Sequence, residues 1–144
     1  MTERDGSDPY DLQRFIEAQA PVFETACAEL ARGRKKSHWM WFIFPQIEGL
    51  GRSPTAQRFA ISGRAEAEAY LRHPVLGPRL RRCAELVNAI EGRSISQIFG
   101  PPDDLKIHSS MTLFGAVADD RQVFLAALRK YFGGGMDPKT LERL

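Results

Sequence analysis

The residues with the clearest chemical potential lie in residues 103–114, which read DDLKIHSSMTLF. In a helix, Asp103, Lys106 and Ser110 share one face, because they lie three and four positions apart. A lysine beside Ser109 could take the hydroxyl proton and assist nucleophilic attack. The order is the reverse of the familiar serine–lysine motif, however, and no oxyanion-hole motif accompanies it. The alternative is structural: an acidic first turn, an Asp–Lys pair, and small serines where helices approach closely.

A run of aromatic residues precedes this segment, and residues 37–46 read SHWMWFIFPQ. Each large ring hides roughly 150–250 Å² when buried, so the run must lie at the centre of the fold. Both tryptophans of the chain, Trp39 and Trp41, belong to it. His38 and Gln46 place polar groups at its ends, so the run could also wall a pocket. Helix and strand both remain open, since every interior position is apolar.

Residues 49–55, GLGRSPT, could form an anion cradle. Ser53 before Pro54 is a typical helix start, whose free N–H groups attract anions. Arg52 would add a charge-assisted donor. The glycines and lysine of a dinucleotide or Walker fingerprint are missing. A plain capped loop is the alternative.

These segments must be held by helices, because the chain alternates apolar stripes of helical spacing with proline and glycine breaks. A cap residue followed by proline recurs at Asp8-Pro9, Ser53-Pro54 and Asp137-Pro138. No strand-like alternation is sustained. We therefore expect an all-α fold: one compact domain, residues 8–144, of about seven to nine short helices joined by Pro/Gly turns. Residues 1–7 are expected to be a disordered tail.

The composition sets limits on function. The 144 residues carry a net charge of only +2, which argues against a dedicated nucleic-acid binder. Cys27 and Cys83 fit free, buried thiols, and the histidines and cysteines lack zinc-ligand spacing, so we expect neither metal nor cofactor. Without a signal peptide or a run of about 20 apolar residues, the protein is expected to be cytoplasmic and not to bind membranes. The sequence does not indicate the oligomeric state.

Over residues 8–144 the chain resembles a bacterial family of uncharacterised single-domain proteins. The resemblance is carried by residues 33–46, GRKKSHWMWFIFPQ, with 49–53, GLGRS, and 73–77, HPVLG, and by DDLK and SSMTLF in residues 103–114. It implies an α-helical domain of unknown function and supplies no reaction. Some members are labelled calpastatin, but that inhibitor is a disordered repeat protein, unlike this chain. At fold level only, the layout is also similar to helical domains that act on ADP-ribose derivatives.

Two hypotheses follow. The first is a domain with one pocket for a small anionic metabolite or nucleotide, with hydrolysis as the candidate reaction. Its candidate catalytic residues are His38 or Asp104 as base and Lys106 as electrostatic stabiliser. The candidate ligand-binding residues are Lys36, Trp39, Trp41, Gln46, Arg52, Ser53, Ser109 and Ser110. The second hypothesis is a non-catalytic protein-interaction module, in which the same residues are packing and caps.

Overall fold

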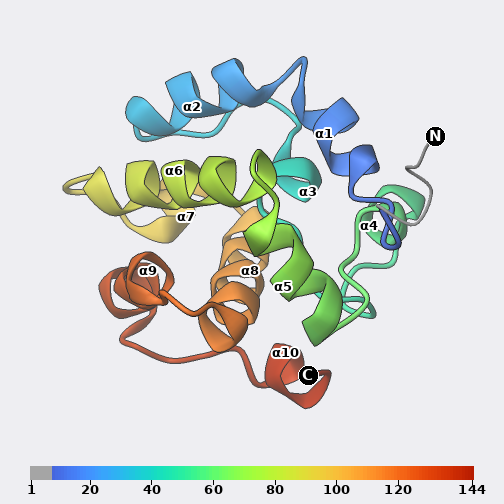
Figure 1. The fold of residues 1–144 in the computed structure, drawn as a ribbon. Coiled ribbons are helices and arrows are strands. Elements are labelled where there is room, and N and C mark those ends of the chain that lie inside the picture. The colour runs from blue at the N-terminus through green and yellow to red at the C-terminus, as the bar shows by residue number, and fades with distance from the viewer. Residues whose placement is uncertain (1–7) are drawn as a thin grey trace.

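The computed structural model describes residues 8–144, over which ten helices follow one another (Figure 1). They are α1 (Gln13–Gln19), α2 (Phe23–Ala31), α3 (Met40–Ile43), α4 (Pro54–Arg58), α5 (Arg64–Arg72), α6 (Leu76–Ala89), α7 (Ile95–Phe99), α8 (Asp103–Val117), α9 (Gln122–Phe132) and α10 (Pro138–Glu142). The all-α prediction is confirmed. There are ten helices rather than seven to nine, because single turns such as α3 form separate elements. The expected tail, residues 1–7, lies outside the described residues.

Helix α8 is the centre of the domain. It packs against α5, α7, α9 and α10, so almost its whole length from Ile107 to Val117 is buried. A helix enclosed on all sides needs apolar or small residues around its full circumference, as the sequence of α8 has after its first turn. Gly115 allows the closest approach, since a Cβ there would lie 3.3 Å from Cβ of Phe124 in α9.

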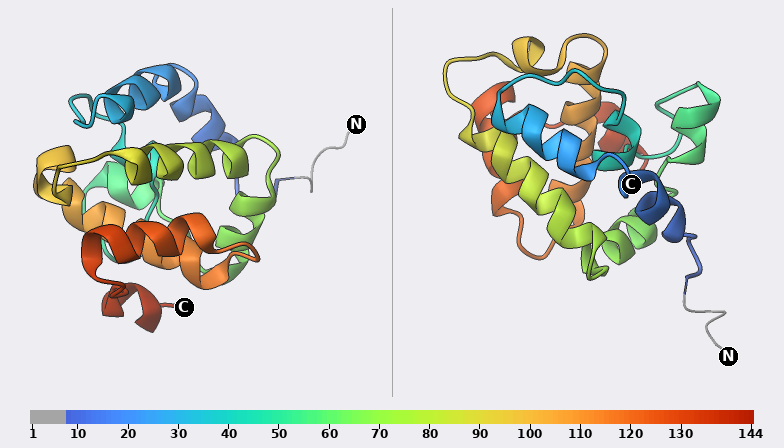
Figure 2. Two further views of the ribbon diagram at one scale, coloured as in Figure 1. Left: turned by 90° about the vertical axis from the view of Figure 1, so that its left-hand side faces the viewer. Right: turned by 90° about the horizontal axis from the view of Figure 1, so that it is seen from above.

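Helix α6 lies between two groups of helices. Figure 2 shows α1 and α2 on one side of α6, with α9 and then α10 on the other. Cys27 of α2 and Cys83 of α6 are both buried and free, as predicted. Burial, together with the neighbouring Cys27 side chain, raises the pKa of the Cys83 thiol. No helix in residues 8–144 is long and apolar enough to cross a membrane.

A buried glutamine joins four helices. Gln19 at the end of α1 donates from Nε2 to the Phe42 carbonyl of α3 at 2.7 Å and to the Tyr70 hydroxyl of α5 at 3.0 Å. Its Oε1 accepts from Arg79 of α6 at 3.3 Å. Because Gln19 is only 1% exposed, these bonds offset the cost of burying its amide. They also fix the relative positions of the four helices.

The cap residues were predicted with partial success. Ser53 caps α4, with Pro54 as its first residue, and Ser94 forms a capping box with Gln97 at α7. The pair Asp8-Pro9 does not open a helix directly. Asp8 instead accepts from the N–H groups of Leu12 and Gln13 across an intervening turn, so that α1 begins at Gln13.

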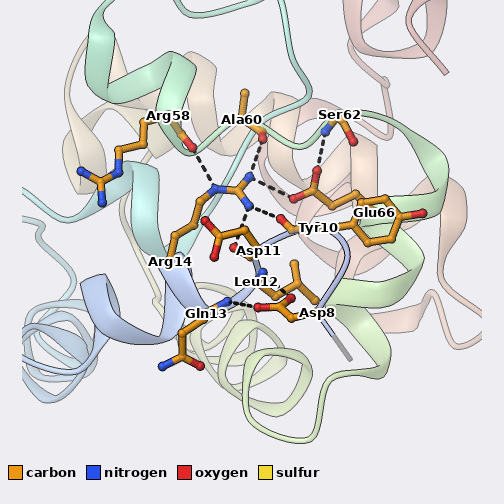
Figure 3. A network of polar contacts seen from close by, with 10 residues as sticks. All are labelled: Asp8, Tyr10, Asp11, Leu12, Gln13, Arg14, Arg58, Ala60, Ser62 and Glu66. Atoms are coloured by element: carbon orange, nitrogen blue, oxygen red, sulfur yellow. Dashed lines mark hydrogen bonds and ion pairs between the residues drawn. The ribbon is translucent and has the colours of Figure 1, made fainter. Parts of the chain in front are cut away.

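Arg14 of α1 anchors the N-terminal part of the domain (Figure 3). Its guanidinium pairs with Glu66 of α5 at 2.9 Å and donates to the carbonyls of Arg58 and Ala60, at 2.8 and 2.9 Å. Glu66 is 3% exposed and also accepts from the N–H of Ser62. Every donor is aimed at a neighbouring backbone or carboxylate oxygen, so this ion pair is structural.

Of the two possibilities left open for the aromatic run, a short helix and a strand, the structure has the short helix. The run forms the single turn α3, after which the chain extends and Ile47 pairs with Ile61 in one isolated bridge. Trp39 and Phe44 are buried, at 0% and 1% exposure, whereas Trp41 and Phe42 are only partly buried. The run therefore has one side in the core and one edge at the surface.

Candidate functional site

The polar start of α8 is a chain of ion pairs. Asp103 binds Lys106 at 3.2 Å, the pair expected for a helical spacing of three, and Lys35 at 2.9 Å. Lys35 comes from the loop after α2, so the second pair joins sequence-distant segments. The Lys106 ammonium also lies 4.5 Å from the centroid of the Trp41 ring, within cation–π range.

Two further predicted site residues lie beside this lysine. Trp41, Gln46 and Lys106 line a small hollow, which is completed by Gly51, by Ala56 of α4 and by apolar side chains of the segments that follow α3 and α4. Its volume is about 10 Å³. A cavity of this size holds about one water molecule and no planar base.

The other candidate catalytic residues lie apart from the hollow. Asp104 accepts from the Ser96 hydroxyl of α7 at 3.1 Å through Oδ2, while its buried Oδ1 has no hydrogen-bond partner among the residues described. His38 is exposed on the loop before α3. Neither residue lines the hollow at Lys106.

The two serines of α8 are buried and serve packing. Ser109 Oγ lies 3.1 Å from the Leu105 carbonyl and 3.2 Å from Oδ2 of Asp137. Ser110 is fully buried, and its hydroxyl has no partner within the described chain. The predicted residues thus separate into several places instead of lining one pocket.

A glutamate that sequence reasoning missed organises the loop before the aromatic run. Glu29 of α2 accepts from the N–H groups of Lys36 and Ser37, the Ser37 hydroxyl and the Trp39 indole. Burial raises its pKa, but the bonds from Ser37, Lys36 and Trp39 outweigh this effect and lower the pKa to about 2. Its position one turn after the buried Ala26 was the available signal. Trp39 and Lys36 are therefore tied to this carboxylate.

Arg52 belongs to a second, larger hollow. A groove of about 490 Å³ lies between the loop 49–52 and α10, and it is lined by Gly49, Leu50, Arg52, Lys139, Glu142 and Arg143. Ser53 lies beside it as the cap of α4, its Oγ accepting from Ala56 at 3.1 Å. Sequence reasoning missed Lys139 and Arg143, although their spacing of four places both on one face of a helix.

Arg143 occupies the space above a glycine. Gly49 has φ +98°, which disfavours any side chain, and a Cβ built there would overlap the Arg143 guanidinium. The glycine thus lets the arginine lie flat against the backbone of the loop. This contact holds the segment that contains α10 against the loop 49–52.

The position of α10 depends on a small polar network. The N–H of Asp137 donates to Oγ1 of Thr112 at 2.9 Å, and Oδ2 of Asp137 accepts from Thr140 at 2.6 Å and from Ser109. Thr112 and Thr140 are fully buried. The serine and threonine of the SSMTLF motif therefore fix the helix that carries Lys139 next to the groove. Within residues 8–144, no three His, Cys, Asp or Glu side chains converge as metal ligands would.

The comparisons agree with the fold and add no reaction. The chain belongs to the family described as protein of unknown function (DUF1810), whose pattern matches residues 9–144. It is similar to the crystal structure of the conserved hypothetical protein Rv1873 from Mycobacterium tuberculosis, with 58% identity and a TM-score of 0.94 over 95% of this chain and 98% of that one. Among curated proteins, none matches closely enough to lend the chain an activity.

Proposed function

We propose that the protein binds a small anionic ligand in the groove between the loop 49–52 and α10. The observation that carries this proposal is the gathering of three cationic side chains, Arg52, Lys139 and Arg143, around one hollow of about 490 Å³. Glu142 is the one acidic residue among its lining side chains. A volume of this size is ordinary for a small-molecule site.

The charges of the groove are available to a ligand. Within the described part of the chain, no ion pair occupies Arg52, Lys139 or Arg143. Arginine side chains present a planar fork of donors that suits phosphate or carboxylate oxygens, and lysine adds a point charge. Leu50 offers an apolar contact for the uncharged part of a ligand. A phosphorylated metabolite or nucleotide fits this chemistry.

The proposal concerns binding and includes no reaction step. His38, Asp104 and Lys106, the candidate catalytic residues, do not line this groove. Lys106 is engaged by Asp103 and by the Trp41 ring instead. The rival hypothesis, a non-catalytic interaction module, predicts no binding of small anions at Arg52 and Arg143.

Thermal unfolding in the presence of inorganic pyrophosphate, ADP or acetate tests the proposal. A ligand that binds only the folded state raises the melting temperature as its concentration exceeds Kd. We expect pyrophosphate or ADP at millimolar concentration to stabilise the wild type, and Arg52→Ala and Arg143→Ala to lose this shift. Arg64→Ala, which removes an exposed cation of α5, is the matched control and should keep it.

Two results would overturn the proposal. One is the absence of any shift with the wild type for all three anions. The other is an equal shift in the wild type, both groove variants and the control, which would show only a general salt effect. A larger shift with ADP than with pyrophosphate would indicate a nucleotide, and the reverse a phosphate group alone.

A further inference from the structure

A second cationic surface lies at the opposite end of the aromatic run from the groove. Exposure alternates along the segment after α2: Arg32, Arg34, Lys36 and His38 are exposed, and the residues between them are buried or half-buried. Arg32 and Gly33 lie in the turn that ends α2, whereas residues 34–36 belong to neither a helix nor a turn, and their alternation is typical of extended backbone, in which successive side chains point to opposite sides. The segment runs back beside α2 towards α3 (Figure 2).

The inward side of this segment is fully engaged. The backbone N–H groups of Lys36 and Ser37 donate to Glu29 at 2.8 and 2.9 Å, and that of Lys35 donates to the Ile98 carbonyl of α7 at 2.8 Å. The Lys35 ammonium pairs with Asp103 and is 8% exposed. These bonds hold the backbone in place and leave the outward side chains free to meet a partner.

A further arginine joins the outward row. Arg93 follows α6, and its Nε would lie 3.2 Å from a Cβ at Gly33, so it packs directly beside the segment. We call Arg32, Arg34, Lys36 and Arg93 the cationic edge. All four are exposed, and none forms an ion pair with another residue of the described chain.

The cationic edge holds a large share of the positive charge of the protein. Its four positive charges exceed the net charge of the entire chain, +2, so the remaining residues are net negative. A surface of one sign on a nearly neutral protein raises the rate of association with partners of the opposite sign.

We propose that the cationic edge binds an extended acidic peptide segment of a partner protein, with carboxylates at every second residue. Same-side residues of an extended chain repeat at about 6.6 Å, twice the rise of about 3.3 Å per residue. Within the edge, Arg34 and Lys36 have this two-residue spacing. An extended partner with Glu or Asp at alternate positions would therefore match Arg34 and Lys36 in register.

Two features favour a peptide over single-stranded nucleic acid. The tryptophan that directly follows this segment, Trp39, faces inward and is fully buried, so its indole offers no surface on which a base could stack. The segment's own N–H groups are already bound inward, so recognition falls to side-chain charges, which carboxylates satisfy. This inference is independent of the anion groove, since the two sites share no residue.

Fluorescence anisotropy with labelled peptides tests the inference. One peptide alternates five Glu with five Thr, and a second has the same composition with all Glu in one block. We expect the wild type to bind the alternating peptide more tightly, and increasingly weakly as NaCl is added. The double variant Arg34→Glu/Lys36→Glu should bind it at least about tenfold more weakly, because two exposed ion pairs are replaced by repulsion.

The control variant is Arg64→Glu/Arg129→Glu, which reverses two exposed cations on α5 and α9 and keeps the same net charge as the test variant. It should bind the peptide as the wild type does, as should Arg143→Ala of the groove. If the Arg34→Glu/Lys36→Glu variant does not fold, the variant Arg34→Gln/Lys36→Gln replaces it as the test variant. Equal affinity for both peptides, equal losses in test and control variants, or tighter binding of an oligothymidylate of the same length would each overturn the inference.

Discussion

The guanidinium group of Arg143 lies directly over the backbone of Gly49, in the space that a Cβ at residue 49 would fill. Arg143 follows α10 near the C-terminal end of the chain, and Gly49 follows the aromatic run. The contact therefore joins two segments separated by most of the fold. A methyl group at residue 49 would displace this guanidinium, which is the end of a flexible side chain.

Gly49→Ala should lower the melting temperature and weaken the anion response. Part of the loss comes from the positive φ, which costs an alanine roughly 1–2 kcal/mol, and part from the clash with Arg143. The two parts separate in a double-mutant cycle, since the second disappears when Arg143→Ala is already present. Strict additivity in chemical denaturation would show that Arg143 does not rest on Gly49 in solution.

The two tryptophans should differ in their contribution to stability. Trp39→Ala removes a ring that is 0% exposed and bonded to Glu29, so a loss of about 3–5 kcal/mol in the free energy of unfolding is expected. Trp41→Ala removes a partly exposed ring and its contact with Lys106, and roughly 1–2 kcal/mol should be lost. Urea denaturation measures both losses, and a larger loss for Trp41→Ala would contradict the deeper burial of Trp39.

Glu29 should make the protein sensitive to acid. Its pKa is about 2 in the folded state and ordinarily 4.5, so the ionised carboxylate stabilises the fold above pH 4.5. This contribution falls as the pH decreases from 4.5 towards 2. Glu29→Gln removes it, so the variant should be less stable at pH 7 and its stability should change less over this range. Denaturation at pH 7, 5, 4 and 3 tests this, and parallel curves would refute it.

The cysteines should react slowly until the protein unfolds. Burial raises the pKa of the Cys83 thiol and so reduces its reactive thiolate fraction, and Cys27 is also buried. A thiol reagent at pH 8 should therefore label the native protein far more slowly than the protein in guanidinium, where two groups should be counted. Immediate reaction of two thiols in the native state would argue against the α2–α6 packing described.

Most of the helical architecture could be predicted from the sequence, because its signals are local. Ser53-Pro54 marks a helix start, because the Ser53 hydroxyl accepts from the N–H group three positions later. Asp8-Pro9 marks the correct region, but the Asp8 carboxylate accepts from Leu12 and Gln13 across a turn. The local sequence pattern does not distinguish such a turn from a helix that begins directly at the proline. The single turn α3 was undecidable for a similar reason, since an apolar run has no period.

The candidate site was less predictable, because it depends on which segments meet. Lys106, Trp41 and Gln46 line one small hollow. Arg52 instead faces Lys139 of α10 and Arg143, which lie about ninety positions later in the sequence. Ser109 and Trp39 looked like ligand-binding residues, yet they bond to Asp137 and Glu29. Charge and aromaticity identify candidate residues, but only the fold identifies their partners.

The two tryptophans lie in different surroundings, so their fluorescence can report on two different parts of the protein. Trp39 is enclosed in the core and bonded to a carboxylate, while Trp41 lies near the surface below an ammonium group. In a Trp41→Phe variant, fluorescence comes from Trp39 alone and follows the integrity of the core. In a Trp39→Phe variant, it comes from Trp41 and follows events near Lys106. The same chain can thus be observed at its interior and at its surface without any attached dye.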